Sequence, residues 1–128
     1  MRTNDRIYEL ADATPEERCT LYLREGGRFE LDRYTGGDCG GTSTTLKGTY
    51  ELSGELLTLR TEQKVTIEDD ATRDLHDVAR SACHEVLSVR LQDDGAAVTF
   101  AFQGVTLSLA RLTPRSRSNA IAGSPPSP

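Results

Sequence analysis

Alternation of apolar and polar residues, broken at short intervals by glycine-containing turns, constrains this chain more than any other sequence feature. In residues 105–112, for example, Val105, Leu107 and Leu109 alternate with polar or small residues. Successive side chains of a β-strand point to opposite faces, so a period of two predicts strands with one buried and one solvated face. The pattern recurs along most of the chain, which predicts an all-β fold.

The expected strands follow one another as hairpins. They are residues 7–10, 19–24, 29–34, 46–52, 56–61, 85–92, 97–102 and 105–112, with residues 65–67 as a weaker strand or an extension of 56–61. Turn signals separate them, among them Gly26-Gly27, Ser53-Gly54, Asp94-Gly95 and Gln103-Gly104. Sequential tight hairpins predict antiparallel, up-and-down order, with the last three strands as a meander.

Three segments depart from the alternation. Residues 35–45 are rich in glycine without periodic apolar residues, which predicts a loop. Residues 69–84 place apolar side chains at helical spacing, which predicts one short helix between the central and C-terminal strands, with an acidic loop as the alternative. Residues 114–128 are rich in Pro and Ser, so we expect a disordered tail after a single domain of residues 1–113.

About eight short antiparallel strands must share one apolar face, either as a sandwich or as a closed barrel. Up-and-down order favours the barrel, which removes its own edges. An eight-stranded barrel is wide enough for side chains or for one small ligand. With three Phe, four Tyr and no Trp to fill the interior, we expect some space to remain near one mouth.

Two of the predicted hairpins resemble those of small bacterial lipocalin-like domains. The matching residues are Leu21-x-Leu23-x-x-x-Gly27-x-Phe29-x-Leu31 and Gly48-Thr49-Tyr50-x-Leu52-x-Gly54-x-x-Leu57-Thr58-Leu59. The resemblance implies a calycin-type barrel and the binding of apolar ligands, without a fixed set of catalytic residues. The chain departs from many such barrels in lacking an early Trp and a lipoprotein signal.

Charge and cysteine content narrow the partners and the compartment. Fifteen basic against twenty acidic residues give a net charge of −5, so no basic face for nucleic acid is expected. The sequence has no apolar run long enough to predict a membrane span, and its first residues do not resemble a secretory signal. Both observations favour a cytoplasmic location. The three cysteines, Cys19, Cys39 and Cys83, favour free thiols, with a Cys39–Cys83 disulfide as the alternative for an exported protein.

No motif in the sequence matches a common catalytic, metal or cofactor site, so no metal or cofactor is expected and the catalytic residues, if any, stay unassigned. The glycine-rich residues 36–41 lack the lysine of a phosphate-binding loop, so they are interpreted as flexible, with a reactive Cys39 as the alternative. On the expected helix His76 and Cys83 would lie about 10 Å apart along the axis, too far to share a zinc ion. General acid or base chemistry by His76, beside Asp74 or Asp77, stays open.

The sequence therefore predicts binding of an apolar or amphipathic small molecule in a barrel cavity, with the entrance flanked by residues 35–45 and 69–84. The candidate ligand contacts are Phe29, Leu31, Arg33, Tyr50, Leu57, Leu59, Phe100, Phe102 and His76. Two alternatives remain at this point. One is a small barrel enzyme, a cyclase or isomerase that orients its substrate in the cavity. The other is a structural or interaction barrel with a filled core and no ligand.

Overall fold

The computed structural model describes residues 6–37, 40–70 and 75–112, and these residues form nine strands and one short 3-10 turn. The strands are β1 (Arg6–Leu10), β2 (Glu17–Arg24), β3 (Arg28–Gly37), β4 (Gly40–Ser53), β5 (Leu56–Asp70), β6 (Leu75–Ala82), β7 (Val86–Gln92), β8 (Ala97–Phe102) and β9 (Val105–Leu112). The 3-10 turn, η1 (Asp93–Gly95), joins β7 to β8. The tail predicted for residues 114–128 lies outside the described residues.

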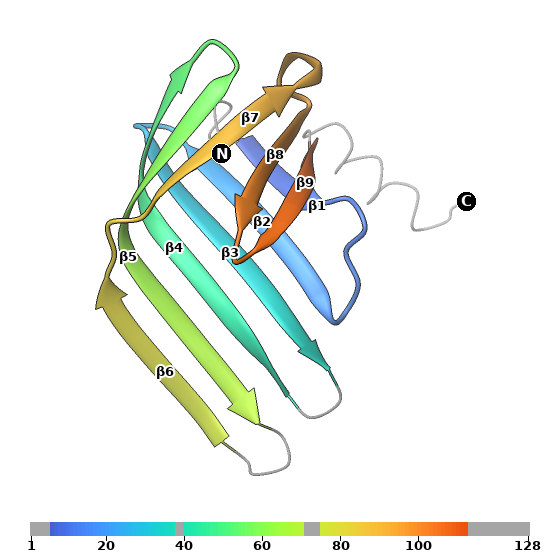
Figure 1. The fold of residues 1–128 in the computed structure, drawn as a ribbon, viewed down its shortest axis with the longest axis vertical. Coiled ribbons are helices and arrows are strands. Elements are labelled where there is room, and N and C mark those ends of the chain that lie inside the picture. The colour runs from blue at the N-terminus through green and yellow to red at the C-terminus, as the bar shows by residue number, and fades with distance from the viewer. Residues whose placement is uncertain (1–5, 38–39, 71–74, 113–128) are drawn as a thin grey trace, which may run out of the picture.

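Eight of these strands close into an antiparallel barrel in the order β1-β2-β3-β4-β5-β7-β8-β9 (Figure 1). The last strand pairs back onto the first, from Ile7 opposite Leu112 to Leu10 opposite Leu109. Closure gives the backbone groups of each strand partners on both sides. The predicted fold class, an all-β up-and-down barrel of about eight strands, is confirmed.

The inward faces of the barrel strands form one apolar core, as the alternation predicted. The buried side chains are Tyr8, Cys19, Leu21, Leu23, Phe29, Leu31, Leu46, Leu57, Leu59, Leu87, Val89, Leu91, Val98, Phe100, Phe102, Leu107 and Leu109. Val105 was also expected inward, but it starts β9 at the hairpin end and is 41% exposed. The middle of the barrel is thus packed with side chains, which leaves the two ends as the places for a ligand.

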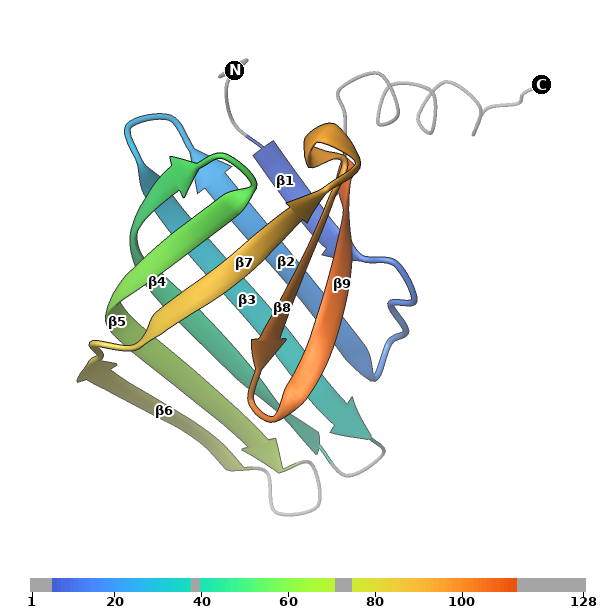
Figure 2. The same ribbon diagram turned by 45° about the horizontal axis from the view of Figure 1, so that its top comes forward.

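The two ends of the barrel differ in shape. The end where β2 turns into β3, and β4 into β5, is named the upper mouth here, and the opposite end is the lower end (Figure 1). Strands β4 and β5, of 14 and 15 residues, continue below the β8–β9 hairpin (Figure 2). The upper part of β5 pairs with β7, and its lower part, residues 63–70, pairs with β6, which stands outside the closed barrel.

The loop predicted for residues 35–45 is instead mostly paired strand. Thr35 pairs with Thr42 and Gly36 with Gly41, so β3 and β4 continue almost to the turn, whose residues 38–39 lie outside the described part. A Cβ at Gly36 or Gly41 would collide with the ring of Tyr34, which therefore covers both glycines. The aromatic ring packs where the paired glycines carry no side chain, so the segment forms strands without an apolar period.

The helix predicted over residues 69–84 does not form, because its residues end β5 and build β6. Ile67 pairs with Val78 and Val65 with Arg80 along this second hairpin, while residues 71–74 lie outside the described part. The long β5 presents unpaired backbone groups below β7, and β6 satisfies them. The helical spacing of apolar residues is not used for burial, since Val78 is 47% exposed.

A bulge at Gly48 lets β5 change partners. Lys47 pairs with Gln63 but the next residue, Gly48, pairs with Thr61, so Glu62 is the extra residue of β5. At this point the Thr61 amide donates to the Glu85 carbonyl (2.9 Å) and the Cys83 amide donates to the Glu62 carbonyl (3.1 Å). The segment between β6 and β7 is thereby attached to the bulge, where β5 leaves the barrel.

Glycine is required at the bulge. A Cβ at position 48 would overlap the Arg60 carbonyl oxygen and lie 3.0 Å from the Phe29 ring. We expect Gly48→Ala to lower the free energy of unfolding by about 3 kcal/mol, because backbone cannot move aside as a side chain can. Urea-induced unfolding followed by circular dichroism measures the change.

The control is Gly37→Ala, where an added Cβ meets no atom within 4 Å. This variant should unfold within about 0.5 kcal/mol of the natural sequence. Equal effects of the two substitutions would show that close packing at the bulge does not require glycine.

Candidate functional site

A cavity of about 310 Å³ opens at the upper mouth of the barrel. Its walls come from β1, β2, β4, β5, β7 and β9, which contribute Arg6, Leu23, Tyr50, Leu52, Leu57, Leu91 and Arg111. Because six strands supply one or two side chains each, the cavity exists only in the closed barrel. An adjoining depression of about 260 Å³ shares Arg6, Leu52 and Leu91 with it.

The floor of this cavity is apolar. Leu23, Leu57 and Leu91 are buried members of the barrel core, and Leu52 stands at the rim with 47% exposure. Tyr50 packs against the core, and its hydroxyl donates to the Arg24 carbonyl (3.2 Å). Since that hydroxyl is already bonded, Tyr50 offers the cavity mainly its ring.

Two arginines stand above this floor. Arg6 shares the inward face of β1 with Tyr8, and Arg111 follows Leu107 and Leu109 on the inward face of β9. Tyr8 pairs with Arg111, so Arg6 and Arg111 are diagonal neighbours on adjacent strands. Such diagonal neighbours lie about 7–8 Å apart, within reach of long side chains. Both side chains line this cavity.

Neither arginine is neutralised by the part of the chain that the structure describes. Ion pairs join other arginines to glutamates, but none involves Arg6 or Arg111. The Arg111 Nε is buried and has no hydrogen-bond partner. Glu55 and Asp94 line the adjoining depression with Arg6, but neither forms an ion pair with it. A buried donor without an acceptor is costly unless a ligand supplies one.

The lower end of the barrel is closed by a polar network around Arg33. The side chain of Arg33 is only 9% exposed, and its Nη2 lies 3.3 Å from the Glu17 Oε2. Its Nη1 donates to the Oε1 of Gln103 (2.7 Å), which belongs to the β8–β9 turn. The Gln103 amide donates in turn to the Thr44 hydroxyl (3.3 Å). These bonds attach the hairpin tip to β2, β3 and β4 across the lower end.

Cys19 lies buried beside this network as a free thiol. Burial raises the pKa of Cys19 to about 12, and the nearby Arg33 opposes this only in part. The thiol therefore stays protonated at neutral pH and is a poor nucleophile. Cys83 is also free, so the alternative disulfide to Cys39 is not formed, and Cys39 itself lies outside the described residues.

A third depression, of about 410 Å³, lies against β2, β3 and β4, and its lining includes Arg18, Asp32 and Tyr34. Burial raises the pKa of Asp32 to about 6; the Thr45 hydroxyl opposes the shift, and the neighbouring Glu30 adds to it. The Arg18 guanidinium stacks 4.8 Å from the centre of the Tyr34 ring. Asp32 Oδ1 and Arg33 Nε in the lining of this groove have no hydrogen-bond partner. The groove is more open to solvent than the upper mouth, so it is the weaker ligand site.

The residues predicted to contact a ligand are divided among four places. Tyr50 and Leu57 line the upper mouth. Arg33 belongs to the network at the opposite end. Five fill the core, namely Phe29, Leu31, Leu59, Phe100 and Phe102. His76 pairs with Asp69 in β6, but its side chain lies outside the described part.

Sequence reasoning missed Arg6 and Arg111, although a signal was present. Each continues the two-residue period of inward residues in its strand, where the alternation calls for an apolar side chain. A charged residue at an inward position is therefore the signal that marks this mouth. Placing the two arginines together needed the pairing of β1 with β9, which no local pattern reveals.

In residues 6–37, 40–70 and 75–112, no three His, Cys, Asp or Glu side chains gather as a metal site would require. No helix in the same residues has the length and apolar character needed to cross a membrane.

A comparison with solved structures finds this architecture in a streptavidin-like protein from Bacteroides eggerthii. Its crystal structure superposes with a TM-score of 0.56, and the match covers 94% of this chain and 87% of that chain. The two sequences are 14% identical, so the likeness shows the fold alone, a closed calycin-like barrel. No protein-family model and no curated protein matches the sequence.

The raised pKa of Asp32 predicts a pH-dependent stability. Because the folded pKa of about 6 exceeds the ordinary value of 3.8, folding favours the protonated carboxyl. That contribution is complete below the ordinary value and is lost as the pH rises through 6. Asp32→Asn removes the charge and keeps an oxygen for Thr45. We expect the variant to gain about 1 kcal/mol of unfolding free energy relative to the natural sequence between pH 4 and 7.5.

Urea unfolding at the two pH values measures this difference. Each protein is compared with itself at the two pH values, so effects of the substitution on packing that do not depend on pH cancel. A stability difference that stays constant from pH 4 to 7.5 would show that Asp32 ionises normally.

Proposed function

We propose that this protein binds a small amphipathic or apolar molecule in the upper mouth of its barrel. The observation that carries the proposal is the cavity of about 310 Å³, with a leucine floor and a polar rim, built by six strands. Ligand sites commonly have volumes of about 300–1,000 Å³, mostly apolar walls and a few polar groups that fix orientation. The upper mouth meets the volume at the small end of that range and has an apolar floor, but its exposed lining is more polar than that of a common ligand site.

The size of the mouth limits the ligand. If each heavy atom takes about 30 Å³, as a water molecule does in the liquid, the cavity accommodates roughly ten heavy atoms. The packed middle of the barrel prevents deeper insertion, because Leu21, Leu31 and Leu59 have no exposed surface. We therefore propose a ligand that rests its apolar part on Leu23, Leu57 and Leu91.

The fold supports a binding role at a general level. The barrel is of the same type as that of a streptavidin-like protein, and two hairpins resemble those of lipocalin-like domains. The described lining of the upper mouth contributes no carboxylate, imidazole or thiol, so it favours binding over acid–base catalysis. Free thiols at Cys19 and Cys83 suit a reducing compartment, and we extend the proposal to a cytoplasmic location.

The second candidate function is a structural or interaction barrel without a ligand. The observation that favours it is the filled centre, where side chains from all eight barrel strands pack together. For such a protein the upper mouth would be no more than a solvated rim. Ligand titration of the mouth separates the two candidates.

The first binding prediction uses a bulky residue at the rim. Leu52→Trp adds volume to a half-exposed side chain that lines the cavity, so it should fill the mouth without disturbing the core. We expect octan-1-ol or sodium octanoate to raise the melting temperature of the natural protein and to have no effect on Leu52→Trp. A ligand at one hundred times its Kd stabilises a protein by about 2.7 kcal/mol, which such melting curves detect.

The matched control is Leu56→Trp, in the same hairpin. Leu56 is 45% exposed and is absent from the cavity lining, so this variant should still respond to both ligands. A natural protein that responds to neither compound, or two variants that respond alike, would contradict binding in the upper mouth.

A further inference from the structure

From the two arginines of the upper mouth we propose that the ligand is an anion, an amphipathic monocarboxylate whose head group binds Arg6 and Arg111 together. This inference rests on the proposed function, because it names the chemical class of ligand for the same cavity.

The positions of the arginines are unusual for their strands. The alternation of β9 places Leu107, Leu109 and then Arg111 on the inward face, and the inward face of β1 carries Tyr8 after Arg6. An arginine at the end of such a series lays its aliphatic stem along apolar neighbours and holds its guanidinium at the rim. Two of them on paired strands create a rim of positive charge above an apolar floor.

Within the described residues, the rim holds two positive charges that form no ion pair. Two guanidinium groups that share one mouth repel each other, and the buried Nε of Arg111 has no acceptor among the described residues. The inward-facing Arg33 at the lower end differs from these two arginines because it has hydrogen-bond partners. Its Nε also lacks a partner, but its two terminal nitrogens bond to Gln103 and Glu17. Among the described residues, the arginine of the closed end has hydrogen-bond and ion-pair partners, whereas neither arginine of the open end forms an ion pair.

A carboxylate is the anion that fits this site best. The guanidinium group presents paired donors in a plane, which match the two oxygens of a carboxylate. Phosphate would satisfy the same donors, but Glu55 and Asp94 line the depression that adjoins Arg6. These two acids would repel a dianion more strongly than a monoanion.

The remaining dimensions suit a short fatty acid. A carboxylate at Arg6 and Arg111 directs its chain onto Leu23, Leu57 and Leu91, which form the apolar floor. A cavity for roughly ten heavy atoms matches octanoate, with eight carbons and two oxygens. The amphipathic shape of the ligand thus mirrors the division of the mouth into a charged rim and a leucine floor.

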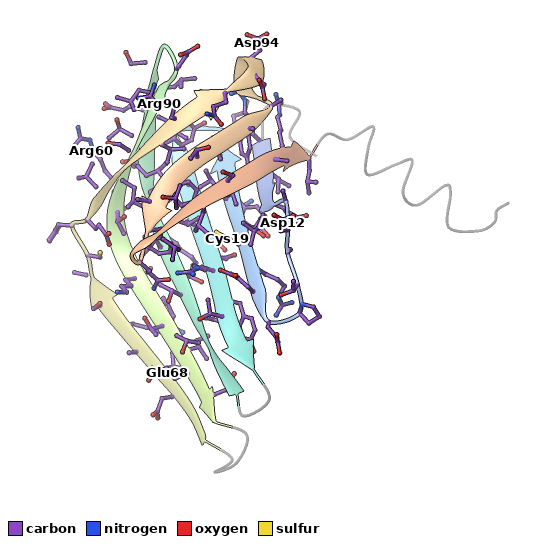
Figure 3. All side chains as sticks on the ribbon, turned by 45° about the vertical axis from the view of Figure 1, so that its right-hand side comes forward. Asp12, Cys19, Arg60, Glu68, Arg90 and Asp94 are labelled. Carbon is purple, nitrogen blue, oxygen red and sulfur yellow. The ribbon has the colours of Figure 1, made fainter. Side chains whose placement is uncertain are left out.

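The experiment titrates the full chain with three compounds that share one alkyl chain: sodium octanoate, octan-1-ol and octylammonium chloride. Isothermal titration calorimetry is carried out on the natural protein, on Arg6→Gln/Arg111→Gln and on Arg90→Gln. Arg90 is an exposed residue on the outer side of β7 (Figure 3), so its substitution changes the net charge without touching the mouth.

We expect the natural protein to bind octanoate at least tenfold more tightly than octan-1-ol, since hydrogen bonds to charged groups are the stronger ones. The double variant should bind both compounds equally weakly, and Arg90→Gln should behave as the natural protein does. Octanoate affinity should also fall as sodium chloride is raised, while octan-1-ol affinity should not.

Lysine variants keep the test valid if the double glutamine variant does not fold. Arg6→Lys and Arg111→Lys retain the charge but lose the planar pair of donors, so each should prefer octanoate over octan-1-ol with reduced affinity. Melting curves of the ligand-free variants verify that they are folded.

The outcomes separate the two proposals. Equal binding of octanoate and octan-1-ol by the natural protein, or tighter binding of octylammonium, overturns the carboxylate assignment and leaves the proposed function standing. Binding of none of the three compounds overturns the proposed function itself. A preference for octanoate that survives in the double variant locates the anion site elsewhere and likewise overturns the assignment.

Discussion

The pairing of β1 with β9 is the interaction on which the rest of the structure depends. Without these backbone bonds the sheet would end in two open edges, and the inward faces of eight strands would not share one interior. Closure turns a simple period of two into an inside and an outside. It also brings together residues from opposite ends of the chain, which is how Arg6 and Arg111 come to stand at one mouth. The candidate site is therefore a product of topology and belongs to no single segment.

The interior of the barrel is packed with side chains, so it meets solvent at the two ends. The polar side chains at the two ends have different contacts. At the lower end Gln103 reaches from the β8–β9 turn to Arg33 and Thr44, so polar side chains inside the barrel bond to one another. At the upper end the polar groups face solvent and a cavity. The same residue type, arginine at an inward position, is thus part of the closure at one end and is available to a ligand at the other.

Most of the barrel could be predicted from local sequence, because alternation reports directly which side of a strand is buried. It succeeded for β7, where exposed and buried residues alternate without interruption. It failed for residues 35–45, where the Tyr34 ring packs over glycines that have no side chain. It also failed for β6, which forms a strand because its backbone pairs with the lower part of β5. The site was harder still. Tyr50 and Leu57 could be placed inward from their period, whereas the importance of Arg6 depends on a pairing with the far end of the chain.

The bulge at Gly48 explains how two different ends coexist on one set of strands. Above it, β5 pairs with β7 and its side chain Leu57 forms part of the cavity floor; below it, β5 pairs with β6 in a sheet extension outside the barrel. The extra residue at Glu62 lies between the part of β5 that pairs with β7 and the part that pairs with β6, while the pairing of β5 with β4 continues on both sides of it. The cavity lining that β5 supplies therefore lies in the part of the strand that pairs with β7, on the opposite side of the bulge from β6.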